Sequence, residues 1–259
     1  METLCTGNIA IVGGTGFEQL PPEIFAEPVA VSTRYGSVEA LSLSDNYTEP
    51  YKLYFMARHG FDHLTAPHQI NYAANTAALL DLGVRHVFAT NAVGSLRLSL
   101  TPGSLMLLDD FIDFTRQRSL TFAVESGSWR HTDFSHPYSP MLRTAVLAAA
   151  GQLQVPVVDG GTYLCCDGPR FETPAEIRMF ANWGADVVGM TGGPEAVFAR
   201  EAGLDYAALA IVTNYGAGLT PDAVDHLHVT AAVAEQVPHI RELLMRAASR
   251  LAGQSDAPA

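Results

Sequence analysis

Short apolar runs that stop at glycine-rich loops alternate with helix-forming segments along this chain. The first run, residues 8–12, reads Asn-Ile-Ala-Ile-Val and stops at Gly13-Gly14-Thr15-Gly16. Residues 71–82 are rich in helix formers and end before Gly83, after which residues 85–90 return to an apolar run. Strands that alternate with helices bury both faces of a parallel sheet. The pattern therefore predicts a single α/β domain with a central mixed, largely parallel sheet flanked by helices.

The most specific local signal in the sequence surrounds Thr173. This threonine can cap a helix, Pro174 suits the first helical position, and Glu176 stands where a capping box needs it. Further strands are expected over residues 51–57, 161–166, 186–190 and 206–213, and further helices over residues 140–153, 174–183, 194–202 and 229–251, the last one interrupted near Pro238. We expect one domain over residues 1–252 and a disordered tail over residues 253–259.

The charge balance limits the partners. The chain has 259 residues, 27 of them acidic and 15 basic, for a net charge of −12, and its one lysine is Lys52. A nucleic-acid binder or a polybasic membrane patch needs more basic residues than this. No segment approaches 18 consecutive apolar residues, the length that a membrane-spanning helix needs. The chain has three cysteines, Cys5 and an adjacent pair at 165–166, and this odd number does not suggest a disulfide framework. We expect a cytoplasmic protein that binds neither nucleic acid nor membrane.

Three loops that follow predicted strands carry groups suited to an anion. In an open α/β sheet, ligands bind beyond the carboxyl ends of the strands. Gly13-Gly14-Thr15-Gly16 offers backbone N–H groups and a hydroxyl, Arg58-His59 offers a guanidinium and an imidazole, and Thr191 precedes a predicted helix N-terminus. A tight turn or an exposed polar pair would explain each signal taken alone. Together they predict a site for a small anion.

Other chemistries lack their residues. The sequence contains no H-E-x-x-H, no paired C-x-x-C and no G-x-S-x-G, which removes support for zincin, zinc-ribbon and α/β-hydrolase readings. His226 and His228 could share a metal ion, but no third ligand is evident, so no metal site is expected. Asp109-Asp110 suits a solvated or structural pair better than the two carboxylates of a glycosidase.

The glycine and polar loops, taken in order, resemble those of the trimeric purine nucleoside phosphorylases and 5'-methylthioadenosine phosphorylases. This resemblance implies reversible phosphorolysis of the nucleoside N-glycosidic bond, which yields free base and ribose 1-phosphate. It implies inorganic phosphate as co-substrate, no metal or organic cofactor, and a homotrimer. The stretches that carry it are residues 11–16, 57–60, 71–72, 90–96, 109–113, 168–173, 184–191, 194–195 and 213–214.

The resemblance also implies roles for individual residues. Phe171 would stack on the purine, Met190 would lie under the ribose, and Asn214, Glu172 and His59 would be the catalytic set. As the glycosidic bond breaks, the sugar becomes oxocarbenium-like and the purine gains negative charge, so both need groups that stabilise charge in the transition state. The residues expected to hold phosphate are Thr15, Arg58, His59, Asn91, Ala92 and Thr191.

The base is expected to be a 6-oxopurine, as in inosine and guanosine. The methylthioadenosine enzymes have aspartate where this chain has Asn214, and an asparagine amide can donate to O6 and accept from a protonated N7. Glu172 can accept from the N1–H of hypoxanthine or guanine, whereas adenine N1 carries a lone pair. Alternatively, Glu172 does not contact the base and has only a structural role in the turn before the Thr173 cap.

The 5' end of the substrate is less defined by the sequence. Residues 58–60 and 109–114 are closer to the methylthioadenosine branch, whose 5' pocket is apolar, whereas His226 lies in an H-x-x-V stretch typical of enzymes that bind a 5'-hydroxyl. Gly216 is also expected to contact the substrate. The segment that begins at this glycine matches the sequence pattern of neither branch. His131, from a neighbouring subunit, would approach the 5' group and His63 would contact the substrate, unless each is an ordinary loop histidine.

Two other functions remain open at this stage. The first is a phosphorylase of 5'-methylthioinosine or 5'-methylthioadenosine. The second is a non-catalytic protein that binds nucleoside or phosphate without turnover.

Overall fold

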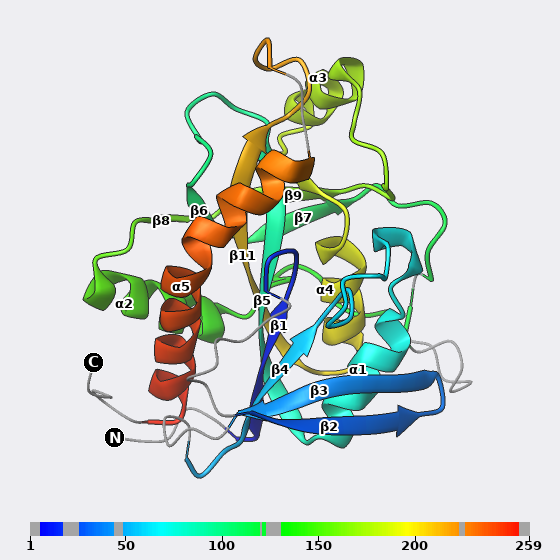
Figure 1. The fold of residues 1–259 in the computed structure, drawn as a ribbon, viewed down its shortest axis with the longest axis vertical. Helices are drawn as coiled ribbons and strands as arrows, with labels where there is room; N and C mark the ends of the chain where they lie inside the picture. The colour runs from blue at the N-terminus through cyan, green and yellow to red at the C-terminus, as the bar shows by residue number, and fades with distance from the viewer. Residues whose placement is uncertain are drawn as a thin grey trace.

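A computed structural model of the protein describes residues 6–17, 26–43, 49–119, 121–122, 131–222 and 226–253. Within these ranges eleven strands form one sheet with helices on both faces (Figure 1). The strands are β1 (Asn8–Gly13), β2 (Ala26–Thr33), β3 (Gly36–Leu43), β4 (Leu53–Ala57), β5 (Val84–Ser95), β6 (Leu105–Leu107), β7 (Asp110–Asp113), β8 (Val157–Asp159), β9 (Thr162–Cys165), β10 (Val187–Gly189) and β11 (Asp205–Tyr215). The helices are α1 (Tyr72–Asp81), α2 (Pro140–Leu153), α3 (Pro174–Asn182), α4 (Gly192–Glu201) and α5 (His226–Leu251), with a 3₁₀ turn, η1 (Pro67–Gln69).

The sheet is mixed, and its centre is parallel. Neighbouring strands follow the order β2-β3-β4-β1-β5-β10-β9-β7, and β11 pairs with both β5 and β6. The parallel pairs include β1 with β4 and with β5, and β5 with β11, while β10 runs antiparallel to β5. The predicted fold class, a single α/β domain with a mixed and largely parallel sheet, is confirmed.

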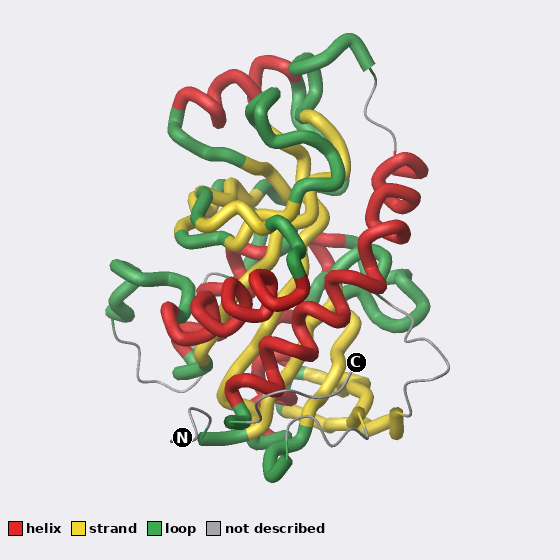
Figure 2. The backbone as a smooth tube through the Cα atoms, turned by 90° about the vertical axis from the view of Figure 1, so that its left-hand side faces the viewer, coloured by secondary structure: helices red, strands yellow, loops and turns green. Residues whose placement is uncertain are grey.

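The central strands are buried on both faces. Side chains alternate across a strand, so Ile9 and Ile11 of β1 pack with α2 and α5, while Ala10 and Val12 pack with α1 and α4. In Figure 2 the helices α2 and α5 lie in front of the strands. The helix α3 covers a separate, smaller cluster near β9 and β10. No helix in the described ranges is long and apolar enough to cross a membrane.

Two strands extend further than the sequence suggested. We expected loops to begin at Asn91 and at Asn214, but both asparagines lie inside strands, β5 and β11, which run to Ser95 and Tyr215. The two strands pair with each other over almost their whole length, and this pairing continues the backbone ladder through both asparagines. The polar residues there do not mark the end of either strand.

The antiparallel edge formed by β2 and β3 was not predicted, since its alternation of small and polar residues is weak. The helix α5 was expected to be interrupted near Pro238, but it runs as one helix with this proline inside it. A proline removes one backbone hydrogen bond, and the buried Ile240, Leu243 and Leu244 hold the following turns on the core. The proposed tail lies, apart from Gly253, outside the described residues.

The helix α3 begins as its sequence predicts. The hydroxyl of Thr173 accepts from the N–H of Glu176, and the Glu176 carboxylate accepts from the N–H of Thr173. Arg170 donates to the same carboxylate, and these bonds together lower the pKa of Glu176 to about 2. This cap fixes the end of the loop that carries Phe171 and Glu172.

Candidate active site

A cavity of about 430 Å³ opens where β1, β4 and β10 end and where β5 and β11 pass beside one another. Most of the residues singled out in the sequence line it. They come from six separate segments of the chain and converge because the strands that precede them share one sheet. Those that line the cavity are Thr15, Arg58, His59, His63, Ala92, Phe171, Glu172, Met190, Thr191, Asn214 and Gly216.

Asn91 and His131 are not among the described residues that line the cavity, and His131 was expected to act from a neighbouring subunit. Asn91 is buried behind the cavity wall, where its side-chain nitrogen donates to the hydroxyl of Thr191 at 3.1 Å. His131 is exposed and does not line the cavity of its own chain. The side chain of His226 lies outside the described part of the structure.

The glycine loop after β1 makes room for Arg58. The N–H of Gly14 donates to the hydroxyl of Thr90, so this donor is already occupied. A Cβ atom on Gly14 would lie 2.8 Å from Nη1 of Arg58 and 2.9 Å from the carbonyl oxygen of Thr90. Only glycine lets the backbone approach the guanidinium this closely.

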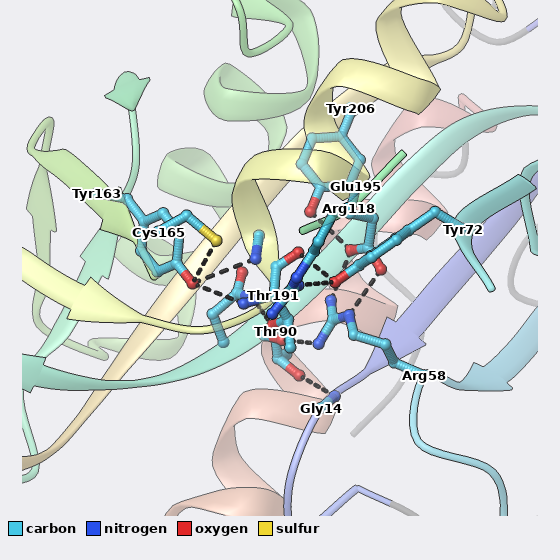
Figure 3. Close-up of polar contacts among 12 residues, drawn as sticks. Gly14, Arg58, Tyr72, Thr90, Arg118, Tyr163, Cys165, Thr191, Glu195 and Tyr206 are labelled. Atoms are coloured by element: carbon cyan, nitrogen blue, oxygen red, sulfur yellow. Dashed lines mark hydrogen bonds and ion pairs between the residues drawn. The ribbon is translucent and has the colours of Figure 1, made fainter. Parts of the chain in front are cut away.

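Arg58 is held by a partly buried carboxylate (Figure 3). Its Nε donates to Glu195 Oε2 at 2.6 Å, its Nη2 donates to Glu195 Oε1 at 2.5 Å, and its Nη1 donates to the carbonyl of Thr90 at 2.9 Å. The hydroxyl of Tyr206 donates to the same carboxylate at 2.7 Å. Burial alone would lower the pKa of Arg58, but Glu195 outweighs burial and holds this pKa above its ordinary value. The guanidinium is therefore permanently charged and fixed in direction.

His59 follows Arg58 and points one ring nitrogen at the backbone. Its Nδ1 lies 2.8 Å from the carbonyl oxygen of Thr65, and because a carbonyl only accepts, Nδ1 carries the hydrogen. The ring of His63 lies beside it, with the centroids 5.0 Å apart, and His63 has a positive φ of 55°. The segment 58–65 thus turns tightly enough to bring both imidazoles to the cavity wall.

Thr191 is tied to three side chains. Its hydroxyl accepts from Asn91, its carbonyl accepts from the hydroxyl of Tyr72 at 3.1 Å, and its N–H donates to the hydroxyl of Tyr163 at 3.1 Å. The N–H of Gly192 donates to the same tyrosine. The α4 N-terminus was expected to offer N–H groups to an anion, but these two are already occupied. Of the residues expected to contact an anion at this position, Thr191 lines the cavity.

The loop after β9 carries the aromatic and acidic lining residues. Phe171 is 37% exposed at the cavity. Burial raises the pKa of the Glu172 carboxyl above its ordinary value, and the nearby Glu176 acts in the same direction. Gly168 has a φ of +63°, and a Cβ there would lie 2.5 Å from Sδ of Met190. A glycine at this point lets the loop pack against the methionine that lines the cavity.

A bulge near the end of β11 directs two consecutive side chains into the cavity. The pairing register with β5 shifts between Val212 and Asn214, so Thr213 and Asn214 both line the site, although neighbours in a regular strand face opposite sides. The hydroxyl of Thr213 lies 2.8 Å from Asn214 Oδ1, and Asn214 Nδ2 donates to the carbonyl of Tyr215 at 2.8 Å. Each polar atom of the Asn214 amide therefore has one further hydrogen bond to offer.

Three residues with no predicted role contact the cavity lining or its neighbours (Figure 3): Glu195 accepts from Arg58, Tyr72 donates to Thr191, and Arg118 donates to Tyr72. Glu195 and Tyr72 fall in stretches that carried the family resemblance, and Glu195 stands in the first turn of α4, where the helix dipole favours an acidic side chain. Arg118 lies in the chain after β7 and carried no local signal. No group of three His, Cys, Asp or Glu side chains in the described ranges could hold a metal ion.

Comparisons with known proteins agree with this geometry. A family model described as "Phosphorylase superfamily" matches residues 8–249. A 6-oxopurine nucleoside phosphorylase of Pyrococcus furiosus is 44% identical over 246 residues, which cover 93% of this chain and 91% of the relative. A protein of Methanothermobacter thermautotrophicus named "Probable S-methyl-5'-thioinosine phosphorylase" is 45% identical over 214 residues, 82% of this chain and 73% of the relative.

Among solved structures, a methylthioadenosine phosphorylase from Schistosoma mansoni in complex with adenine superposes with a TM-score of 0.87 at 31% identity, covering 96% of this chain and 93% of that one. The sequence similarity, the shared fold and the family match extend over nearly the whole chain. The chain therefore belongs to the phosphorylase superfamily, within the family of purine nucleoside and 5'-methylthioadenosine phosphorylases.

Proposed function

We propose that this protein catalyses the reversible phosphorolysis of 6-oxopurine nucleosides, with inosine and guanosine as the leading substrates. One observation carries the proposal. A single cavity brings together Thr15, Arg58, His59 and Thr191, which suit a phosphate ion, and Glu172 and Asn214, which suit a 6-oxopurine. The named activity of the Pyrococcus relative supports the same conclusion.

Arg58 has the donors that a phosphate needs. A guanidinium has five N–H groups, and three of those of Arg58 are used by Glu195 and Thr90, which leaves two. The hydroxyls of Thr15 and Thr191 and the second ring nitrogen of His59 add further contacts. Phosphate bound there would stabilise the oxocarbenium-like sugar and then attack C1' as the bond from C1' to the purine nitrogen breaks.

The purine would take the electron pair of that bond and be stabilised by Asn214 and Glu172. The Asn214 amide has one N–H left for O6 and one acceptor position left for a protonated N7, because its other hydrogen bonds go to Tyr215 and Thr213. An ionised Glu172 would accept from N1–H. Adenine has neither O6 nor an N1–H. Leaving one buried polar group unsatisfied costs about 1 to 3 kcal/mol, which is roughly a ten- to hundredfold change in substrate preference.

A second candidate substrate is 5'-methylthioinosine. Leu64, Ala66 and Pro67 also line the cavity and give it an apolar wall that would suit a methylthio group. The similarity to the Methanothermobacter protein favours this alternative. It keeps the same base and phosphate contacts, so the two substrates differ only at the 5' position.

The remaining expectations belong to this proposal. The protein would act as a cytoplasmic homotrimer in purine salvage, with inorganic phosphate as co-substrate and no cofactor. His131, exposed in its own chain, would reach the 5' group of a nucleoside in a neighbouring subunit, and His226 would contact a 5'-hydroxyl.

A substrate panel tests the function. Inosine, guanosine, adenosine, 5'-methylthioinosine and 5'-methylthioadenosine are each incubated with the protein, with and without phosphate, and release of free base is measured. Phosphate-dependent release of hypoxanthine is expected, and the ratio of kcat/KM for inosine and methylthioinosine ranks the two candidates. Activity with 6-aminopurine nucleosides alone would refute the proposal, and binding without turnover would identify a non-catalytic protein.

A further inference from the structure

Arg118 joins two parts of the active site that are far apart in the sequence. Its side chain is 3% exposed and lies in the chain that follows β7. Its Nη2 donates to the carbonyl of Asp167 at 2.7 Å, and its Nη1 donates to the hydroxyl of Tyr72 at 2.8 Å. The Asp167 carboxylate lies 3.6 Å from Nε and supplies the opposite charge. One planar guanidinium therefore contacts two separate segments.

The first of these segments is the loop that contacts the purine in the proposed function. Cys166, whose carbonyl also accepts from Arg118 at 3.4 Å, and Asp167 directly precede Gly168, and the same loop continues to Phe171 and Glu172 at the cavity. Fixing the two carbonyls fixes the start of this loop.

The second segment is the turn that contacts phosphate. Tyr72 is 5% exposed at the start of α1, and its hydroxyl donates to the carbonyl of Thr191 at 3.1 Å. Burial raises the pKa of Tyr72 well above its usual range, so the phenol keeps its proton and remains a donor. The tyrosine ring packs against Phe198 of α4, with the centroids 6.0 Å apart. The Tyr72 hydroxyl therefore contacts both Arg118 and Thr191 directly.

We propose that Arg118 and Tyr72 are positioning residues that hold the purine loop and the phosphate turn in a fixed relation. Neither side chain lines the cavity, so they act through the residues they hold. Two donors on one rigid, planar group set the spacing of the two segments, which a lysine with its single nitrogen cannot do. The proposal rests on the function proposed above.

The two residues are expected to have different effects on the two substrates. Tyr72→Phe keeps the ring and removes the hydroxyl, so Thr191 loses one of its three side-chain hydrogen bonds while Arg118 still holds the purine loop. It should raise the KM for phosphate about fivefold, as expected for one lost hydrogen bond, and leave the KM for inosine within about twofold. Arg118→Met removes the contacts to the purine loop and leaves the Tyr72 hydroxyl, which still donates to Thr191, without the donor that orients it, so it should raise both KM values. Arg118→Lys should not restore both.

Arg143→Met is the matched control. Arg143 makes the same kind of contact, because it donates to the carbonyls of Leu107 and Leu108 and pairs with Asp159, but it lies on α2 and does not line the cavity. Its replacement should lower the melting temperature without separating the two KM values. Melting temperatures of all variants are recorded beside the kinetics.

Equal changes of both KM values in Tyr72→Phe, or unchanged KM values in Arg118→Met at a lowered melting temperature, would overturn the proposal. Calorimetric titration of each protein with inorganic phosphate gives a second comparison that needs no turnover. A wild type that binds phosphate but cleaves no nucleoside would contradict the proposed function, and the phosphate affinity of Tyr72→Phe would then decide the positioning role. An unchanged affinity there would overturn it.

Discussion

Replacing Glu195 with glutamine tests how much the carboxylate partner of the buried Arg58 contributes to stability. Arg58 makes two charge-assisted hydrogen bonds to this carboxylate, and its side chain has no exposed surface. Breaking a buried ion pair by removing one charge costs about 3 to 5 kcal/mol, because the remaining charge is left uncompensated. Glutamine keeps the shape and one acceptor oxygen, so we expect a loss near the lower end, about 3 kcal/mol. In a chain of this size, that is a drop in melting temperature of about 6 to 12 °C.

Thermal unfolding without phosphate and at saturating phosphate gives the comparison. A phosphate dianion near Arg58 would replace the lost negative charge, so phosphate should stabilise Glu195→Gln more than it stabilises the wild type. Glu176→Gln is the control, because the Arg170–Glu176 pair has the same bidentate form but is exposed. It should lose less than about 1 kcal/mol. A Glu195→Gln protein as stable as the wild type, or one that gains no more from phosphate, would refute this reasoning.

Three further predictions concern the base and its loop. Asn214→Asp should shift the ratio of kcat/KM toward 6-aminopurine nucleosides, because a carboxylate repels O6 and accepts from an amino group; an unchanged ratio would show that Asn214 does not contact the base. Because burial raises the pKa of Glu172, this carboxyl should take up a proton at a higher pH than an ordinary glutamate does, and the KM for inosine should rise on mild acidification. Glu172→Gln should lack that acid dependence in a pH profile. Gly168→Ala should lower kcat/KM and the melting temperature, since its positive φ and the 2.5 Å approach of Sδ of Met190 leave no room for a methyl group.

Local signals predicted those parts of the site that depend on local structure. The Thr173 cap is set by residues three positions apart, and Arg58 and Thr15 directly follow buried apolar strands. Such features need no knowledge of distant contacts, and the structure places both Arg58 and Thr15 at the cavity.

Long-range pairing decided the rest. Asn91 resembles a loop residue in sequence, but the ladder between β5 and β11 keeps it inside a strand and turns it toward Thr191. Glu195 and Arg58 are 137 positions apart, and Arg118 reaches Tyr72 across 46 positions. No periodicity or capping rule connects residues at such distances, because only the assembled sheet brings them together.

The bulge in β11 adds one side chain to the cavity wall without changing the pairing on either side of it. Val212 lies opposite Val93 and Asn214 opposite Gly94, and Thr213 is the extra residue between them. Deleting Thr213 would leave a regular strand in which Asn214 still lies opposite Gly94, so this deletion should remove the contacts of Thr213 and keep the choice of base. Deleting Tyr215 instead would bring Gly216 into its place opposite Ser95 and change the end of the wall, so one missing residue should have different effects on the two sides of Asn214.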